Sequence, residues 1–228
     1  MFIKNVPLPM TTFPGSPRLI RGGIVLIDPG TSQVLRIIAL QYNPDNLSRT
    51  LQVQGVGGEG SDRMEALRLK GPPVETIKLE AEIDATDQLE FPDTHATVAE
   101  VGIHPQLAAL ETIVYPSSFQ LLANNRQAKS GTLEIAPMET PLSLFVWSKN
   151  RILPVRLTEF SITEEAFDTA LNPIRAKVSL GMRVMSVMDL GFDHKGGNLF
   201  MIYLQQKERL SGRSQQAVFN TFGIGGIT

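Results

Sequence analysis

Two segments of strict alternation constrain this chain more than any other feature of its sequence. Apolar side chains alternate with charged or polar ones over residues 74–83, and the same pattern recurs over residues 174–184. A period of two places successive side chains on opposite faces of a β-strand, so each segment predicts a strand with one buried and one solvated face. The solvated face is mostly acidic in the first strand and basic in the second.

Further strands are predicted where β-branched or alternating segments are bounded by turn residues. Residues 22–28 and 33–40 resemble a hairpin joined by an Asp-Pro-Gly turn. The remaining predicted strands cover residues 47–53, 131–135, 141–148 and 152–162.

Only one or two helices are expected. The clearest lies near residues 105–115, where Pro105 stands at its start and Pro116 ends it, and a second, amphipathic helix is predicted over residues 198–210. No regular strand-helix-strand rhythm connects these elements. The sequence therefore predicts a mainly β fold, an antiparallel β-barrel or sandwich, in preference to a parallel doubly wound sheet.

The length of 228 residues is enough for one large domain. We expect an extended N-terminal arm over residues 1–21, a tube-like β-barrel domain over residues 22–210, and a C-terminal tail over residues 211–228.

Charge and composition exclude several function classes. The chain has 21 Lys and Arg against 23 Asp and Glu, and this balance is not that of a strongly basic nucleic-acid binder. It has no cysteine, which excludes disulfides, thiolate metal sites and a thiol nucleophile. No secretory signal and no membrane span is predicted. A reducing cytoplasm is therefore the expected compartment.

The strongest enzyme-like motif is the Gly-rich segment over residues 55–60, which matches the dinucleotide-binding pattern G-x-G-x-x-G. Gly71, Pro72 and Pro73 interrupt the helix that would have to carry the pyrophosphate. The three histidines are widely spaced, and no nucleophile elbow occurs. We accordingly predict a non-enzymatic protein with no catalytic residue, metal or cofactor.

The acidic and basic strand faces leave two interpretations open. Surfaces of opposite sign on regular strands suit assembly between copies of the chain. Two merely solvated faces would give the same sequence pattern.

Several segments taken together resemble the contractile injection system tube protein family. They are GIVLIDP at residues 23–29, ALQYNPDNL at residues 39–47, EALRLKGPPVETI at residues 65–77 and LNPIRA at residues 171–176. The resemblance covers residues 20–190, and the joint order of the last three segments carries it. Some relatives end in a LysM module, for which residues 211–228 are too short, so the resemblance is to the type without that module.

The resemblance implies a baseplate tube or tube-initiator subunit with a barrel like that of tail-tube proteins. Such a subunit forms a ring, by analogy a hexamer, that connects the spike and hub to the inner tube within an injection particle assembled in the cytoplasm. The implied partners are further copies of the chain, the inner tube protein, the spike or hub protein and other baseplate components. The family supplies no catalytic residues. The candidate subunit-interface residues are Gly57, Gly58, Arg68, Lys70, Pro72, Arg175, Lys177 and Arg183.

Two rival functions remain open at this stage. A monomeric β-barrel module that binds a ligand or carbohydrate would need a concave, aromatic-lined site. A nucleotide-using enzyme would need the Gly-rich loop, and Gly57→Ala would then abolish nucleotide binding.

The charge pattern makes a direct prediction about assembly. We expect charge reversal at Arg175 and Lys177 to impair ring formation while leaving the fold intact, which particle size in solution and circular dichroism would measure. Normal assembly of this variant would contradict the interface assignment.

Overall fold

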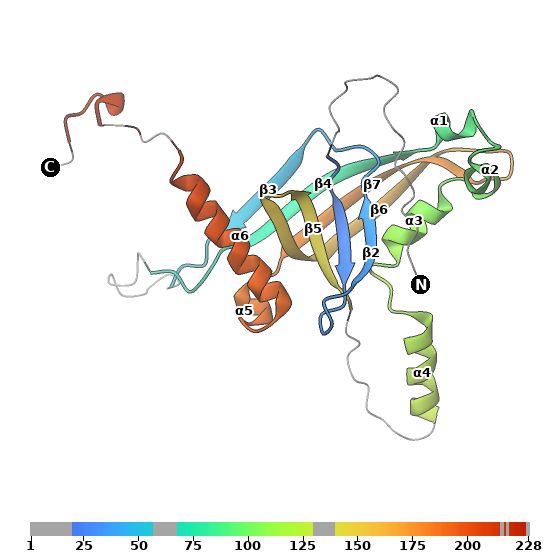
Figure 1. Ribbon diagram of the computed structural model, residues 1–228, viewed down its shortest axis with the longest axis horizontal. Coiled ribbons are helices and arrows are strands. Elements are labelled where there is room, and N and C mark those ends of the chain that lie inside the picture. Colours follow the sequence, from blue (N-terminus) through green and yellow to red (C-terminus); the bar gives the residue numbers. More distant parts are fainter. Residues whose placement is uncertain (1–19, 57–67, 130–139, 215–216, 218, 227–228) are drawn as a thin grey trace.

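The fold is built on one seven-stranded sheet, in which the strands follow the order β2-β1-β5-β6-β7-β4-β3 (Figure 1). The computed structural model describes residues 20–56, 68–129, 140–214, 217 and 219–226. All neighbouring strands pair antiparallel, so the prediction of a mainly β, antiparallel fold is confirmed. The strands are β1 Gly23–Ile27, β2 Val34–Ala39, β3 Leu47–Gln52, β4 Val74–Asp84, β5 Leu142–Ser148, β6 Arg151–Phe167 and β7 Pro173–Val184.

Helices are more numerous than expected. Among the described residues there are six α-helices, and a short 3-10 helix covers Phe219–Phe222. The α-helices are α1 Thr86–Leu89, α2 Ala96–Val101, α3 His104–Glu111, α4 Ser118–Lys129, α5 Val187–Leu190 and α6 Lys195–Ser211. The prediction of one or two was wrong because α1, α2 and α5 are too short to show a helical period and α4 buries no side chain.

The two predicted helices are both present with changed ends. α3 begins with Pro105 in its first turn but ends at Glu111, four residues before the helix predicted near 105–115 would end. Leu107 and Leu110 are buried, whereas Val114 is exposed, so the apolar stripe is shorter than the sequence suggested. The amphipathic helix over 198–210 corresponds to α6. The expected strand over residues 131–135 and most of the expected arm over residues 1–21 lie outside the described residues.

The sheet is not closed into a barrel, because its two edge strands do not pair with each other. β2 and β3 are consecutive in the chain but lie at opposite edges, and side chains of the connecting segment are held by hydrogen bonds to the end of β4 and to the residues before β1. Gln41 donates to the carbonyl of Asp84 and accepts from its N–H, at 2.6 and 3.0 Å. Asn43 accepts from the N–H of Gly22 at 2.8 Å and donates to the carbonyl of Ile20. A curled, open sheet results.

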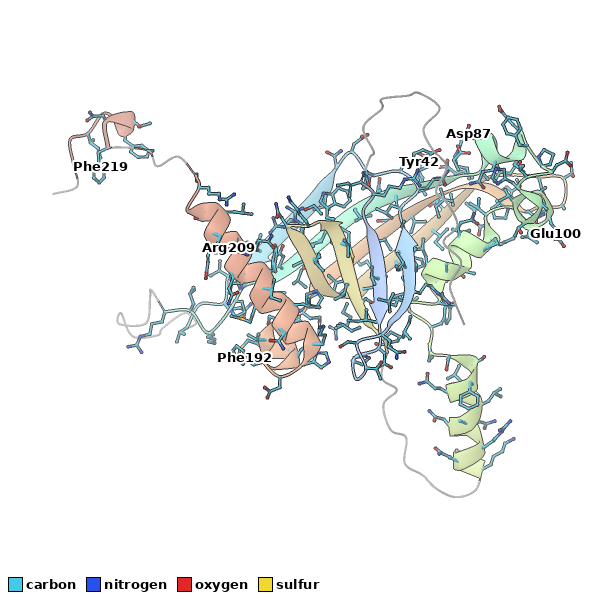
Figure 2. The ribbon with its side chains drawn as sticks, viewed as in Figure 1. Tyr42, Asp87, Glu100, Phe192, Arg209 and Phe219 are labelled. Carbon is cyan, nitrogen blue, oxygen red and sulfur yellow. The ribbon has the colours of Figure 1, made fainter. Side chains whose placement is uncertain are left out.

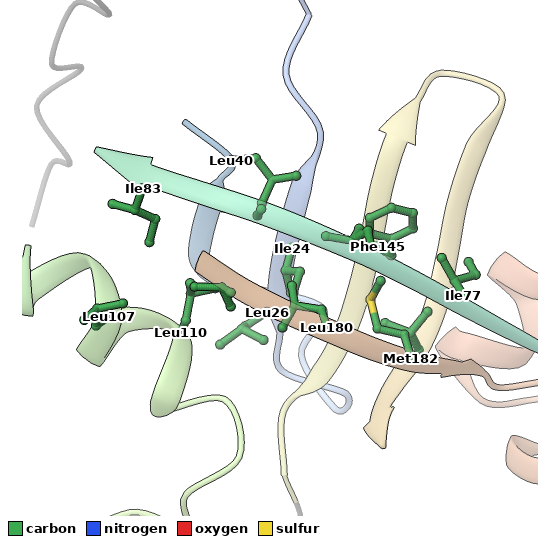
Figure 3. Packing of buried hydrophobic residues seen from close by; sticks show 14 of the residues in the cluster. Ile24, Leu26, Leu40, Ile77, Ile83, Leu107, Leu110, Phe145, Leu180 and Met182 are labelled. Atoms are coloured by element: carbon green, nitrogen blue, oxygen red, sulfur yellow. The ribbon is translucent and has the colours of Figure 1, made fainter. Parts of the chain in front are cut away.

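The main apolar core fills the concave side of this sheet. The inward residues of β4 and β7, among them Ile77, Leu180 and Met182, meet Ile24 of β1 and Phe145 of β5 (Figure 3). α2, α3 and α6 contribute further buried side chains to the same cluster. The alternation predicted for residues 74–83 and 174–184 therefore places apolar side chains in the core as expected.

The corner between α2 and α3 is fixed against the hairpin that joins β6 to β7. Gly102 has φ of +58°, and a Cβ there would stand 2.3 Å from the carbonyl oxygen of Pro173. The N–H of Ile103 donates to that same oxygen at 2.9 Å. Asn172 reaches from the hairpin to the carbonyl of Glu100 at 3.1 Å. This corner therefore accepts only a residue without a side chain.

We expect Gly102→Ala to lower the free energy of unfolding by about 2 to 4 kcal/mol, because alanine pays for both the positive φ and the clash with Pro173. Urea denaturation measures this change. Gly55→Ala is the matched control, since a Cβ at Gly55 meets nothing within 4 Å, and it should stay within about 0.5 kcal/mol of the parent. Equal stability of the two variants would contradict the account of this corner.

Candidate assembly surface

On the convex face of β4, β7 and β6, the five rows from Thr76 to Asp84 carry only polar residues and glycine, and we call these rows the outer face. The strand registers align its members in five rows across the three strands. In the order β4, β7, β6 the rows are Thr76-Arg183-Arg156, Lys78-Gly181-Glu159, Glu80-Ser179-Ser161, Glu82-Lys177-Thr163 and Asp84-Arg175-Glu165. The acidic face of residues 74–83 and the basic face of residues 174–184 are thus adjacent within one chain.

The basic residues of β7 on the outer face form ion pairs with acidic residues of the same chain. Arg175 Nε lies 2.8 Å from Asp84 Oδ2 and 3.8 Å from Glu82 Oε1. Lys177 Nζ lies 3.0 Å from Glu165 Oε1. Both cations therefore have partners within the chain before any second copy approaches.

The protonation of these groups follows from the pairs. Partial burial by itself would raise the pKa of Asp84, but hydrogen bonds from Thr86 and Arg175, with the charge of Arg175, hold the pKa below its ordinary value. The hydrogen bond to Asp84 raises the pKa of Arg175, and the hydrogen bond to Glu165 raises that of Lys177.

One ion pair crosses a whole strand. Lys78 on β4 and Glu159 on β6 are separated by β7, yet Lys78 Nζ donates to Glu159 Oε2 at 2.7 Å. The residue between them is Gly181, where a Cβ would lie 2.8 Å from the Cβ of Glu159. Glycine at this position leaves the space through which the two charges meet.

The long strands end in open backbone edges. β5 pairs with β6 only as far as Val155, so in the described part of the chain no backbone group pairs with residues 156–167 of β6 on the side away from β7. β3 forms the other edge, and it pairs with β4 only up to Leu79. We call the unit formed by β3, β4, β7 and residues 156–167 of β6 the blade. Among the described residues, no strand pairs with either of its outer edges.

Not all predicted interface residues lie together. Gly57 and Gly58 fall outside the described residues. Arg175 and Lys177 lie on the outer face near the end of β4, whereas Arg183 lies at the other end of β7, where it bonds Asp189 of α5 at 2.7 Å. Arg175, Lys177 and Arg183 are thus distributed over the length of the blade.

The remaining three candidates lie at the base of the Gly-rich loop. The carbonyl of Arg68 accepts from the N–H of Val56, and the N–H of Lys70 donates to the carbonyl of Gln54, at 3.0 and 2.8 Å. Arg68 and Lys70 are exposed, and Pro72 is half-buried. A Cβ on the adjacent Gly71 would approach Met188 of α5. This segment therefore lies beside α5, and Arg183 lies beside the same helix.

The sequence interpretation missed a buried ionic cluster beneath α6. Glu75, 3% exposed, accepts from Arg49 at 2.7 Å and from Lys207 at 3.1 Å. The hydroxyl of Tyr203 donates to the same carboxylate at 3.2 Å, and Lys207 Nζ lies 4.2 Å from the centre of the Tyr203 ring. A signal existed, because Glu75 and Arg49 are charged residues at the inward positions of two neighbouring strands.

Hollows on the described surface are shallow and mixed in character. A hollow of about 590 Å³ lies on the outer face itself, between residues 42–48 and side chains such as Glu80 and Ser179, and Tyr42 is its only aromatic lining residue. This is not the aromatic-lined site that a carbohydrate-binding module would need. Within the described residues no group of three or more His, Cys, Asp or Glu could hold a metal ion.

None of the described helices is both long and apolar enough to cross a membrane.

Nine chains of solved structures match this chain in structure. No protein-family model and no curated protein matches the chain. Among solved structures, a chain from the tail of an empty GTA particle with C6 symmetry matches at 14% identity and a TM-score of 0.27, covering 72% of this chain and 90% of that chain. At this TM-score the two chains superpose only in part, and nothing about this protein is inferred from the match.

The pair between Asp84 and Arg175 makes stability depend on pH. Because the pKa of Asp84 is lower in the folded than in the unfolded chain, its contribution is present above the ordinary value of 3.8 and is lost as the pH falls through the folded value. We expect Asp84→Asn to cost about 1 kcal/mol at pH 7 and progressively less as the pH is lowered from about 4 to about 2.

Denaturant unfolding at pH 7 and through this acidic range measures this difference. Glu80→Gln is the matched control, because Glu80 lies on the same face of β4 and makes no ion pair with any described residue. An equal cost of Asp84→Asn at all these pH values would contradict the role of the charged pair.

Proposed function

We propose that this chain is a structural, non-catalytic subunit of a phage-tail-like contractile injection particle. Copies of it form a ring that connects the spike and hub to the inner tube. The sequence resemblance over residues 20–190 suggests this role. The observation that carries it is the blade, whose two open edges lie on opposite sides of one polar face.

Open strand edges favour association because their N–H and C=O groups can pair with another strand. The two edges of the blade differ, since one belongs to β3 and the other to β6. Contact between unlike surfaces is head-to-tail, and such contacts close into a ring when the rotation between copies permits. An open, two-edged sheet therefore fits a ring better than a monomeric binding module.

The two faces of the blade fix which side would line the ring. The concave side is filled by the apolar core and by α2 and α3, so it is not available to solvent. The outer face is polar along its whole length. We infer that in the ring the outer face lines a water-filled channel and the helices lie outside it.

The ion pairs of the outer face change how the interface role of Arg175 and Lys177 should be tested. Charge reversal at Arg175 also breaks its contact with Asp84, so a loss of assembly must be separated from a loss of stability. A backbone change at an open edge avoids this ambiguity.

We expect proline in the free edge of β6 to block ring formation. In an antiparallel ladder the N–H groups of successive residues point alternately to the two sides, so one of Ser161 and Ile162 directs its N–H to β7 and the other to the open edge. We therefore compare Ser161→Pro with Ile162→Pro. The variant whose replaced N–H points to the open edge keeps its hydrogen bonds to β7, so it should fold normally and remain monomeric.

Light scattering and negative-stain images of purified protein measure assembly, and thermal unfolding by circular dichroism measures the fold. The parent chain should give rings, and deletion of its gene in the host should leave no sheathed tubes. A parent protein that stays monomeric at high concentration would overturn the proposal. Rings formed by the well-folded proline variant would show that this edge is not the contact.

A further inference from the structure

α4 is the described helix with the least support from the rest of the molecule. None of its side chains is buried, and none joins either apolar cluster of the fold. Figures 1 and 2 show it standing clear of the sheet, with its side chains directed into solvent. A 12-residue helix is of marginal stability in water by itself. The exposed apolar side chains of α4, which join neither cluster of the described residues, therefore point to a partner that packs against them.

One stripe of α4 has a distinct chemical character. Phe119, Leu122, Arg126 and Lys129 are spaced by three, four and three residues, which places them along one side of a helix. Phe119 is 77% exposed and Leu122 is 55% exposed. The stripe thus offers two apolar side chains followed by two cations, and α4 contains no acidic residue.

The complementary surface lies on the segment that carries α1 and α2. Between Lys78 and Arg126 the chain contains eight Asp or Glu residues and no Lys or Arg. Four of these acids are exposed on or beside α1 and α2, around Phe91, which is itself 63% exposed. We call this surface the acidic tip; its residues are Asp87, Glu90, Phe91, Asp93 and Glu100. Figure 2 labels Asp87 and Glu100 at the end of the molecule where β6 and β7 turn.

We propose that α4 of one copy docks on the acidic tip of another copy. Phe119 and Leu122 would pack against Phe91, and Arg126 and Lys129 would lie among the surrounding carboxylates. An aromatic ring beside cations also allows a cation-π contact. This inference rests on the proposed assembly of copies, and it adds a contact that does not involve the edges of the blade.

Charge favours the acidic tip over the other exposed surfaces. Two α4 helices carry charge of the same sign, so neither supplies carboxylates for the other's Arg126 and Lys129, and the outer face offers no apolar partner for Phe119. The exposed apolar residues of the α5 region, Met188 and Phe192, are neighboured by Asp193 and Lys195, whose charges cancel. The acidic tip alone among these combines an exposed aromatic ring with uncompensated negative charge.

The absence of cysteine allows a direct test by cross-linking. Ser118→Cys places a thiol beside Phe119, and Thr97→Cys places one on the exposed surface of α2. When the two single variants are mixed and treated with a bifunctional maleimide, we expect a cross-linked dimer that contains one of each. Ser214→Cys, beyond the end of α6, is the control and should give no such product with Ser118→Cys.

Charge reversal tests the chemistry of the contact. Arg126→Glu with Lys129→Glu should lower the cross-linked fraction by about fivefold, as expected for the loss of two surface ion pairs. Mixing this variant with Asp87→Lys/Glu90→Lys should restore the cross-link. If this mixture of charge-reversed variants gave no more cross-linked dimer than the first variant alone, the assignment of these charges would be overturned.

The remaining outcomes separate this inference from the proposed function. Rings without a Ser118–Thr97 cross-link would overturn the docking of α4 and leave the ring intact. A cross-link within one chain of the double variant, or between two Ser118→Cys chains, would also overturn it. A cross-link between copies that form no ring would support the docking and overturn the ring.

Discussion

The fold depends on the pairing of β4 with β7 in a single register. With Ile83 opposite Ala176 and Glu82 opposite Lys177, the apolar side chains of Ile77 to Ile83 and of Ala176 to Val184 enter the core, and the charged side chains of Lys78 to Asp84 lie on the outer face. A slip of one residue would exchange the two faces. The ion pair of Arg175 with Asp84 follows from this register, and the pairs Lys177–Glu165 and Lys78–Glu159 depend also on the register of β6 with β7.

Parts of two of the sequence segments singled out above act at the corners of the fold. In the QYNPDNL segment, Gln41 and Asn43 hold the chain where it passes from one edge of the sheet to the other. In the LNPIRA segment, Asn172 and Pro173 join the turn between β6 and β7 to the α2–α3 corner. Few residue types fit these positions. At Gln41 and Asn43 a side chain makes hydrogen bonds to the backbone of other segments, and at the α2–α3 corner the backbone of Pro173 leaves no room for a larger residue.

The sequence was most informative where side-chain period and burial coincide. The alternation over residues 74–83 and 174–184 identified both faces of β4 and β7 correctly, since each strand has one solvent-exposed and one buried face. It could not show that these strands are neighbours, and so it could not show that Arg175 meets Asp84. The cluster around Glu75 was missed because it joins residues 49, 75 and 207, which only the tertiary fold brings together. α4 was missed because a helix without a buried face has no apolar period to detect.

Charge balance on the outer face has a consequence for transport. Its five rows contain five basic side chains, Lys78, Arg156, Arg175, Lys177 and Arg183, and five acidic ones, Glu80, Glu82, Asp84, Glu159 and Glu165. The difference, 5 − 5, is zero. The charges are not spread evenly, because the row of Arg183 and Arg156 is positive while the rows of Glu80 and of Asp84 are each negative. A channel lined by this face would therefore carry no net charge but would present a positive band at one end and a negative band at the other.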